Sequence, residues 1–266
     1  MRIVTWNCHQ ATATSAAWVY LEKLSPDVAL LQEVRSIPGK LLKQYESAQG
    51  IPRAPSGGPQ KFITALLVRG ELQESIELSS PHDWVRSELE YFAGNLVAHR
   101  IRLLSGTELN CICVYSPAWP VKRERLQGVD TAGVQLTQNR DVWVTDLLWA
   151  ALSHIADELG EPWVIAGDLN SSETFDSWSG GPRGNREYLD RMASLGLVEC
   201  LRESQGELTP TFRNPKGGAI KHQMDHLFVT PPLAERLEIC RTGSHDEVFG
   251  ARLSDHLPII ADFDPT

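Results

Sequence analysis

The sequence lacks the features that mark secreted and membrane-spanning proteins. Its five cysteines are an odd number and are scattered along the chain, so they do not form the paired framework of a small secreted domain. No hydrophobic run approaches the roughly 20 residues that cross a bilayer, and the chain does not open on a signal-peptide pattern. We therefore expect a cytoplasmic protein that does not associate with membranes, with a monomer favoured.

Positive charge is also scarce. Lys and Arg number 25 against 34 Asp and Glu, which gives a formal net charge of -9. Broad, sequence-blind binding to nucleic acid needs a positive surface, so this balance argues against that class of protein. It does not exclude an enzyme that acts on nucleic acid, because carboxylates that hold a divalent cation attract phosphate locally.

The 266 residues and 42% hydrophobic content allow a sizeable core, and no repeat or low-complexity tract divides the chain, so residues 1–266 are predicted to form one domain. Strand-like runs are predicted at 2–7, 27–32, 62–68, 92–101, 109–115, 163–167, 223–229 and 258–263, helices at 15–24 and 144–159, and loops at 50–60, 116–133 and 177–186. Cys111 and Cys113 are two apart in one strand, which predicts buried thiols on the same face. Many apolar strands with few helices between them indicate an α/β fold of two packed sheets with helices outside.

Polar side chains interrupt the apolar runs where the predicted strands end. They are Asn7, Glu33, Tyr115, Asp168, Asn170, Asp225, Asp255 and His256. Taken singly, each has an ordinary explanation as a turn residue, a helix cap or a surface charge. Together they form a pattern, because layered α/β folds place ligands and catalytic groups at strand ends.

The residue types in this pattern match one chemistry. Carboxylate and amide oxygens are the ligands that Mg²⁺ or Mn²⁺ prefers, and Mg²⁺ in proteins commonly also binds substrate phosphate. His256 can donate a hydrogen bond to a phosphate oxygen, and an acidic neighbour such as Asp225 favours its imidazolium form.

In order along the chain, the stretches TWN, LLQEV, VYSP, GDLN, MDHLFV and SDHLPI resemble the endonuclease/exonuclease/phosphatase superfamily. That superfamily includes exonuclease III-type abasic-site endonucleases and pancreatic-type DNases, and the resemblance runs from residue 3 to residue 263. It implies a four-layer α/β/β/α sandwich with two mixed sheets. It also implies metal-dependent hydrolysis of phosphoesters.

The resemblance further implies a metal site with Mg²⁺ or Mn²⁺ as cofactor. Glu33 would be the principal metal carboxylate, and Asn7 a neighbouring contact to metal or phosphate. Asp255 would lie at a second metal position or in the outer shell. Asp168 would contact the metal cluster and orient or deprotonate the attacking water.

The other roles that the resemblance implies concern the phosphate. Asn170 would hydrogen-bond phosphate or water, and His256 would contact the scissile phosphate while Asp225 polarises it. Tyr115 stands where abasic-site endonucleases carry a tyrosine, and would steady the phosphate or the leaving group.

Two positions near these motifs leave alternatives open. Abasic-site enzymes usually have an acid two residues after the Asn of WN, whereas this chain has His9 there. His9 is interpreted as a metal ligand, a substrate contact or a loop residue. Arg35 in LQEVR, which is closer to the DNase version, either approaches the site or lies on the surface.

The loops supply further candidates for substrate binding. Lys122 and Arg123 form a basic stretch after Tyr115. It is interpreted either as a solvated loop or as a loop beside the site that contacts backbone phosphates. Trp178 and Arg183 follow the GDLN stretch and are candidates for base stacking and phosphate contact.

A zinc site at His222 and His226 is rejected. Four residues of a strand span roughly 13 Å, so the two rings would not share one ion.

The leading functional hypothesis is a nuclease that acts on DNA, with RNA an open alternative. The acidic net charge favours the rival, a phosphatase or phosphodiesterase for a small phosphorylated molecule. A non-catalytic module that retains the fold is a third reading, against which the near-complete set of acids, amides and histidine argues. The fold does not decide among substrates.

Overall fold

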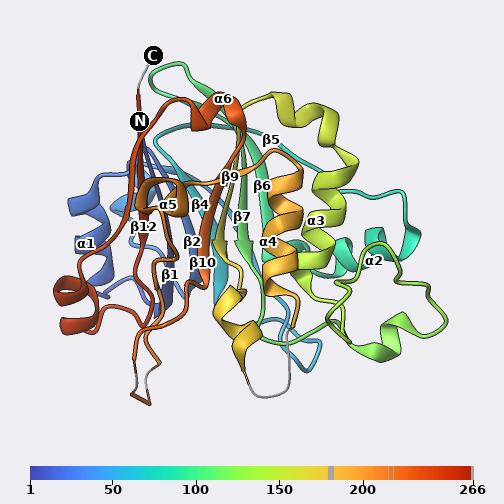
Figure 1. Cartoon of the computed structure of the whole chain (residues 1–266). Helices are drawn as coiled ribbons and strands as arrows, with labels where there is room; N and C mark the ends of the chain where they lie inside the picture. Colours follow the sequence, from blue (N-terminus) through green and yellow to red (C-terminus); the bar gives the residue numbers. More distant parts are fainter. Residues whose placement is uncertain (179–182, 215, 218, 265–266) are drawn as a thin grey trace.

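The long apolar runs form the central strands of two six-stranded sheets that pack face to face, as the computed structural model shows in Figure 1. The structure describes residues 1–178, 183–214, 216–217 and 219–264. The first sheet has the order β11-β12-β1-β2-β4-β3. Its strands are β1 (Arg2–Ala11), β2 (Val28–Val34), β3 (Glu46–Gly50), β4 (Ile63–Val68), β11 (Leu237–Thr242) and β12 (Ile259–Phe263).

The second sheet has the order β5-β6-β7-β8-β10-β9. Its strands are β5 (Gly70–Ser75), β6 (Leu96–Leu103), β7 (Glu108–Tyr115), β8 (Trp163–Asp168), β9 (Val198–Glu199) and β10 (Asp225–Val229). The parallel pairing of β7 with β8 sets Tyr115 beside Asp168, and the antiparallel pairing of β8 with β10 sets Asp225 beside Asp168. Three candidate residues therefore meet at one end of this sheet.

Helices cover the outer faces of both sheets. They are α1 (Ala17–Leu24) on the first sheet and α2 (Asp83–Tyr91), α3 (Val144–His154) and α4 (Asn185–Ser194) on the second. Two short helices, α5 (Cys200–Gln205) and α6 (Pro231–Ala234), instead pack against the core between the sheets. One apolar core lies between the sheets and holds Cys111 and Cys113, both fully buried as predicted. A second core lies between the first sheet and α1, and a third between the second sheet and α2, α3 and α4. This layering confirms the α/β/β/α sandwich, and no described helix is long and apolar enough to cross a bilayer.

The four strands that the sequence pattern did not predict are the edges of the two sheets. They are β3, β5, β9 and β11. Edge strands are short and half solvated, so they lack the continuous apolar run by which the central strands are recognised. In β3 and β5, for example, no residue is fully buried.

Three other boundary predictions need correction. The strand predicted at 92–101 begins only at Leu96, because residues 93–95 form a 3₁₀ turn in which the buried Asn95 donates a hydrogen bond to the Tyr115 carbonyl, 2.9 Å away. The helix predicted at 144–159 ends at His154 and continues as a 3₁₀ helix. The loop predicted at 177–186 overlaps the start of α4, and its residues 179–182 lie outside the described part of the chain.

Gly167 in the GDLN stretch is required by the close approach of two strands. A Cβ atom at this position would lie 1.8 Å from the Val114 carbonyl oxygen, on the neighbouring strand β7. No side chain fits in that space, so the glycine permits the β7–β8 pairing that brings Tyr115 and Asp168 together.

Asp146 gives the fold a pH dependence that can be measured. It lies fully buried in the first turn of α3 and accepts a hydrogen bond from the Trp143 backbone N–H at 2.7 Å. Burial raises the pKa of its carboxyl to about 7. The unfolded carboxyl releases its proton near pH 4, so the folded state binds more protons between these values and stability falls as pH rises from about 4 to 7.

We expect Asp146→Asn to flatten this part of the stability profile, because the amide keeps an acceptor for Trp143 and never ionises. The gain in unfolding free energy over wild type should be near zero at pH 4 and about 1–3 kcal/mol at pH 8. Urea denaturation at both pH values measures it. An equal change at both would show that ionisation of Asp146 is not the cause.

Candidate active site

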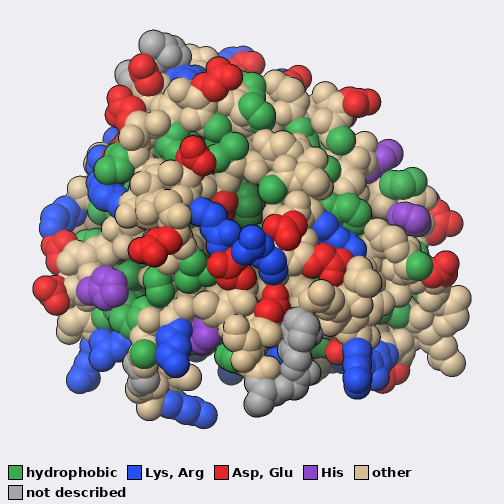
Figure 2. All heavy atoms as spheres, viewed as in Figure 1, with side chains coloured by type: hydrophobic (Ala, Val, Ile, Leu, Met, Phe, Trp, Pro, Cys, Tyr) green, Lys and Arg blue, Asp and Glu red, His purple; other side chains and the backbone are tan. Residues whose placement is uncertain are grey.

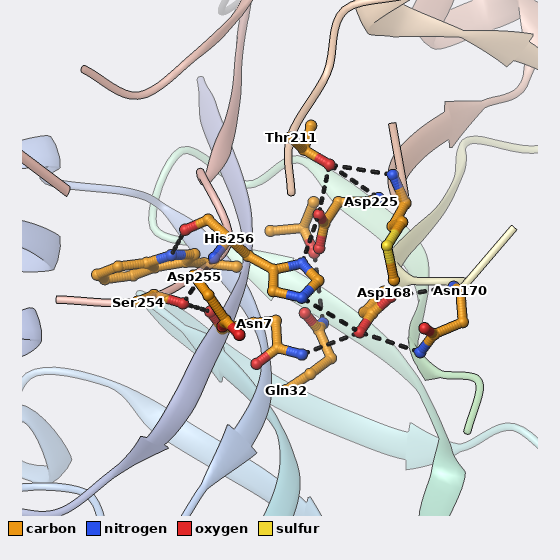
Figure 3. A network of polar contacts seen from close by, with 12 residues as sticks. Asn7, Gln32, Asp168, Asn170, Thr211, Asp225, Ser254, Asp255 and His256 are labelled. Carbon is orange, nitrogen blue, oxygen red and sulfur yellow. Dashed lines mark hydrogen bonds and ion pairs between the residues drawn. The ribbon is translucent and has the colours of Figure 1, made fainter. Parts of the chain in front are cut away.

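Three buried side chains from three different strand ends converge at one place. Asp168 ends β8, Asp225 begins β10, and His256 lies just before β12. One carboxylate oxygen or ring nitrogen from each lies within 4.8 Å of the other two. Figure 3 shows the His256 imidazole between the two carboxylates. The His256 imidazole is thus enclosed by two acids, and all three side chains are buried.

His256 is fixed in orientation and charge by its neighbours. Its Nδ1 donates to Asp225 Oδ2 at 2.8 Å, and the Thr211 hydroxyl donates to the same oxygen at 2.6 Å. The Trp6 indole N–H donates to the His256 carbonyl at 2.8 Å. Burial lowers the pKa of the imidazole, but the carboxylates of Asp225 and Asp168 outweigh it and raise this pKa to about 10. The ring is therefore an imidazolium at neutral pH.

Asp168 is held by two asparagine side chains. Asn7 Nδ2 donates to Oδ2 at 2.9 Å, and Asn170 donates to Oδ1 through its backbone N–H at 3.0 Å and to Oδ2 through its side chain at 3.2 Å. The Asn170 side chain also donates to the Ser116 carbonyl. Burial raises the pKa of the Asp168 carboxyl, and the positive charge of His256, whose Nε2 lies 4.0 Å from Oδ2, opposes that rise. The carboxylate is thus rigid and close to a cation.

Glu33 lies near the end of β2, next to Tyr115. Its backbone φ is 52°, a left-handed conformation that non-glycine residues seldom adopt and that is often found at functional sites. The Tyr115 hydroxyl donates to Glu33 Oε1 at 3.4 Å, and the Tyr115 ring packs edge-on against Phe62. Burial raises the pKa of Glu33, whereas the charge of His256 and a hydrogen bond from Asn7 lower it. Glu33 therefore belongs to the same electrostatic unit as Asp168.

Asp255 and His256 point in different directions from one turn. The Ser254 hydroxyl fixes that turn, because it donates to the Asn7 carbonyl at 2.6 Å and accepts the His256 N–H at 3.0 Å. Asp255 Oδ1 lies 3.0 Å from His9 Nδ1. In Figure 3, Ser254 and Asp255 lie on one side of the imidazole and Asp168 on the other. The adjacent acid and base of the SDH stretch therefore face different partners.

The donor set fits a divalent cation that prefers oxygen ligands. Glu33 and Asp168 are carboxylates whose burial disfavours their charged form, which a nearby cation would relieve. Asn7 adds an amide between them, consistent with the oxygen chemistry of Mg²⁺ or Mn²⁺. Asp225 and His256 Nδ1 are already hydrogen-bonded to each other. The carboxylates of Glu33 and Asp168 are therefore the better candidates for metal ligands.

The rings of His222 and His226 have separate hydrogen-bond partners. His222 Nδ1 lies 2.7 Å from the Thr174 hydroxyl, whereas His226 Nε2 lies 2.9 Å from the Ser171 carbonyl. Neither ring belongs to the metal-capable group of side chains found within the described ranges.

Two of the substrate-binding candidates line a pocket beside Asn170. This pocket has a volume of about 260 Å³, and Trp178 and Arg183 form part of its wall. The Trp178 side chain is 45% exposed, and the Arg183 guanidinium carbon lies 5.2 Å from the centroid of its ring. Phe175 packs against the same indole at 4.6 Å. An aromatic platform with a cation thus adjoins the buried cluster.

The remaining basic candidates lie on the surface and have other contacts. The Arg123 guanidinium donates to the Asp141 carboxylate at 2.8 Å, which links two parts of the loop between β7 and α3. Lys122 is exposed. Arg35 is exposed and donates to Gln10 at 2.5 Å. The structure does not bring these three side chains together with the cluster.

Several contacts of the cluster had no signal in the sequence. Thr211 holds Asp225, and the Phe212 ring packs on the His256 ring with centroids 4.9 Å apart. Both come from the segment between α5 and β10, which carries neither an apolar run nor a paired acid and base. Ser254 lies inside the SDH stretch, yet its role depends on a contact with residue 7 that only the fold creates.

Solved structures with a similar fold include an AP endonuclease and a 3′-5′ exonuclease. An AP endonuclease from Archaeoglobus fulgidus superposes with a TM-score of 0.69 at 20% identity, with 99% of each chain covered. The 3′-5′ exonuclease NExo from Neisseria meningitidis gives 0.67 at 21% identity, covering 99% of this chain and 100% of that one. The catalytic domain of Xenopus laevis APE2 gives 0.67 at 21% identity, covering 99% and 91%. At these identities the likeness shows the fold.

Family membership comes from the sequence itself. No curated protein sequence matches the chain. The family model described as Endonuclease/Exonuclease/phosphatase family matches residues 4–256, which include every residue of the buried cluster. The chain therefore belongs to the endonuclease/exonuclease/phosphatase family, as its motifs predict.

Proposed function

We propose that the protein is a divalent-metal-dependent phosphodiester hydrolase that acts on DNA. The observation that carries this proposal is the buried Asp168 carboxylate, which two asparagines hold within 4.0 Å of the His256 ring. An acid fixed beside an imidazolium can orient a water while the cation stabilises charge on a phosphate.

Glu33, Asn7 and Asp168 would hold the ion, with Asp255 in an outer position because its carboxylate is paired with His9. A bound Mg²⁺ or Mn²⁺ would supply Lewis-acid stabilisation of the phosphate and the leaving oxygen. The residues of the chain do the rest of the positioning.

Asp168 would accept a hydrogen bond from the attacking water and direct it in line with the scissile bond. Its own donors, Asn7 and Asn170, prevent the carboxylate from rotating. The His256 Nε2–H would donate to a non-bridging phosphate oxygen, and Asn170 would steady the phosphate. The Tyr115 hydroxyl, next to Glu33, would support the leaving group.

Two observations favour DNA over a small phosphorylated molecule. The pocket beside Asn170 presents the Trp178 ring and the Arg183 guanidinium, which suit a base and a backbone phosphate. The similar structures are described as an AP endonuclease and a 3′-5′ exonuclease. On the face in Figure 2, acidic and basic side chains are interspersed, which suits binding at a local site rather than along a broad positive surface.

A substrate panel tests this proposal. Purified protein with Mg²⁺ or Mn²⁺ is given supercoiled plasmid, single-stranded DNA, an abasic duplex, RNA and a generic phosphomonoester. We expect cleavage of at least one DNA substrate, and log affinity for it that falls steeply with log salt concentration. Intact polymers with a hydrolysed monoester would instead establish the small-molecule phosphatase.

A further inference from the structure

A second pocket, of about 380 Å³, opens on the Asp255 side of the cluster. Its wall includes His9 from β1, Arg213 from the segment between α5 and β10, and Arg252 from the segment before β12. Asp255 and Ser254 also line it. Three basic side chains from distant parts of the sequence therefore share one pocket.

Contacts along the chain connect the wall of this pocket to the active-site residues. The Arg213 backbone N–H donates to the Asp255 carbonyl at 2.9 Å. The preceding residue, Phe212, forms a backbone bridge with His256 and packs its ring on the imidazole. Ser254 joins the pocket to the Asn7 carbonyl. A group bound in this pocket would thus lie close to a phosphate at His256.

The two arginines of the pocket are not neutralised within the protein. Among the described residues, neither Arg213 nor Arg252 has a carboxylate within 4.0 Å, unlike Arg123, Arg125 and Arg186. The Arg213 guanidinium lies over the Phe249 ring at 5.8 Å. Unpaired guanidinium groups in a pocket of a chain with net charge -9 indicate a site for an anion.

The backbone holds two of these basic residues in an unfavourable conformation. His9 has a φ of 45° and Arg252 a φ of 55°, both in the left-handed region. Such strain persists where the surrounding structure fixes it, often at binding sites. The Asp255 carboxylate, which also lines the pocket, is paired with His9 at 3.0 Å.

We propose that this pocket binds a second phosphate group of the substrate, adjoining the phosphate that is hydrolysed at Asp168 and His256. The planar guanidinium of an arginine matches the geometry of phosphate oxygens, and two of them give the site its affinity. This inference rests on the proposed phosphodiesterase function. The second phosphate is either an internal phosphodiester of a strand or a terminal phosphomonoester.

Three short substrates distinguish these sources: a dinucleotide with one phosphodiester, a trinucleotide with two, and the dinucleotide with a terminal phosphate. The variants are Arg213→Gln and Arg252→Asn, since asparagine tolerates the left-handed backbone at 252. The control is Lys43→Gln, which removes one positive charge from an exposed side chain on the 3₁₀ helix Leu41–Lys43. Hydrolysis is followed with Mg²⁺, and binding of the same oligonucleotides is followed in EDTA.

We expect each pocket variant to raise KM and Kd about 10-fold or more for a substrate with the second phosphate. In these variants kcat should change less than about 3-fold, and so should KM and Kd for the single-phosphate dinucleotide. The Lys43→Gln control should change KM, Kd and kcat less than about 3-fold for every substrate. A loss with the trinucleotide alone identifies an internal phosphodiester, and a loss with the terminal phosphate alone identifies a phosphomonoester.

The second-phosphate site would be overturned if the variants raised KM and Kd equally for all three substrates. It would also be overturned if they changed neither value for any substrate. If wild type hydrolyses none of them, the panel of DNA substrates decides the proposed function, and the binding data in EDTA decide the pocket. Tighter binding of the two-phosphate probes that disappears in the variants would support it, and unchanged binding would refute it.

Discussion

Asp168→Asn is expected to lower kcat by about 10³-fold and to leave the protein folded. The amide has nearly the same shape as the carboxylate, but it cannot accept the proton of the attacking water, and its N–H groups would face the donors of Asn7 and Asn170. The lost hydrogen bonds should lower stability, and this loss is partly offset because burial disfavours the charged form of Asp168. The rate of DNA cleavage and the thermal midpoint measure the two effects.

The matched control is Asp157→Asn, the same chemical change on an exposed residue of the 3₁₀ helix after α3. It should cleave at the wild-type rate. If Asp168→Asn retained more than a tenth of the wild-type kcat, Asp168 would not be the residue that activates water.

Replacing His256 by Gln should lower kcat by about 10²- to 10³-fold, because a neutral amide cannot supply the positive charge that stabilises the phosphate. Asp225→Asn should cost about 10- to 100-fold, since Asp225 acts by orienting and charging the imidazole. The double variant should be no slower than His256→Gln alone, as expected when one residue works through the other.

The exposed His82→Gln serves as the control for the histidine change and should be silent. If the fold loss of kcat in the double variant equalled the product of the two single losses, Asp225 would not be a positioning residue for His256. Asp225 would then have its own contact with substrate or metal.

The candidate site could be read from the sequence because its key residues follow buried strands. Asp168 and Asp225 end and begin central strands, so the apolar runs that predict those strands also locate the acids. Thr211 and Phe212 could not be found in this way, because they act from an irregular segment whose position depends on the tertiary fold. His9 and Asp255 show the same limit, since their pairing joins residues 246 positions apart along the chain.

The central strands could be predicted from the sequence, whereas the edge strands and two of the helices could not. Central strands such as β8, whose six residues are all buried, can be predicted from their continuous run of apolar residues. Edge strands such as β3 carry polar residues on half-solvated faces, and their pairing partner decides their conformation. The helices α2 and α4 are rich in charged residues and become amphipathic elements only against the second sheet.

The proposed function depends on a divalent cation that Glu33 would hold. Its most direct test compares Mg²⁺-dependent cleavage of plasmid DNA by wild type and by Glu33→Ala, with Glu207→Ala as an exposed control. We expect wild type and the control to cleave only with the metal, and Glu33→Ala to be slower by about 10³-fold. Cleavage by Glu33→Ala at the wild-type rate, or cleavage by wild type in excess EDTA, would contradict the metal-dependent site.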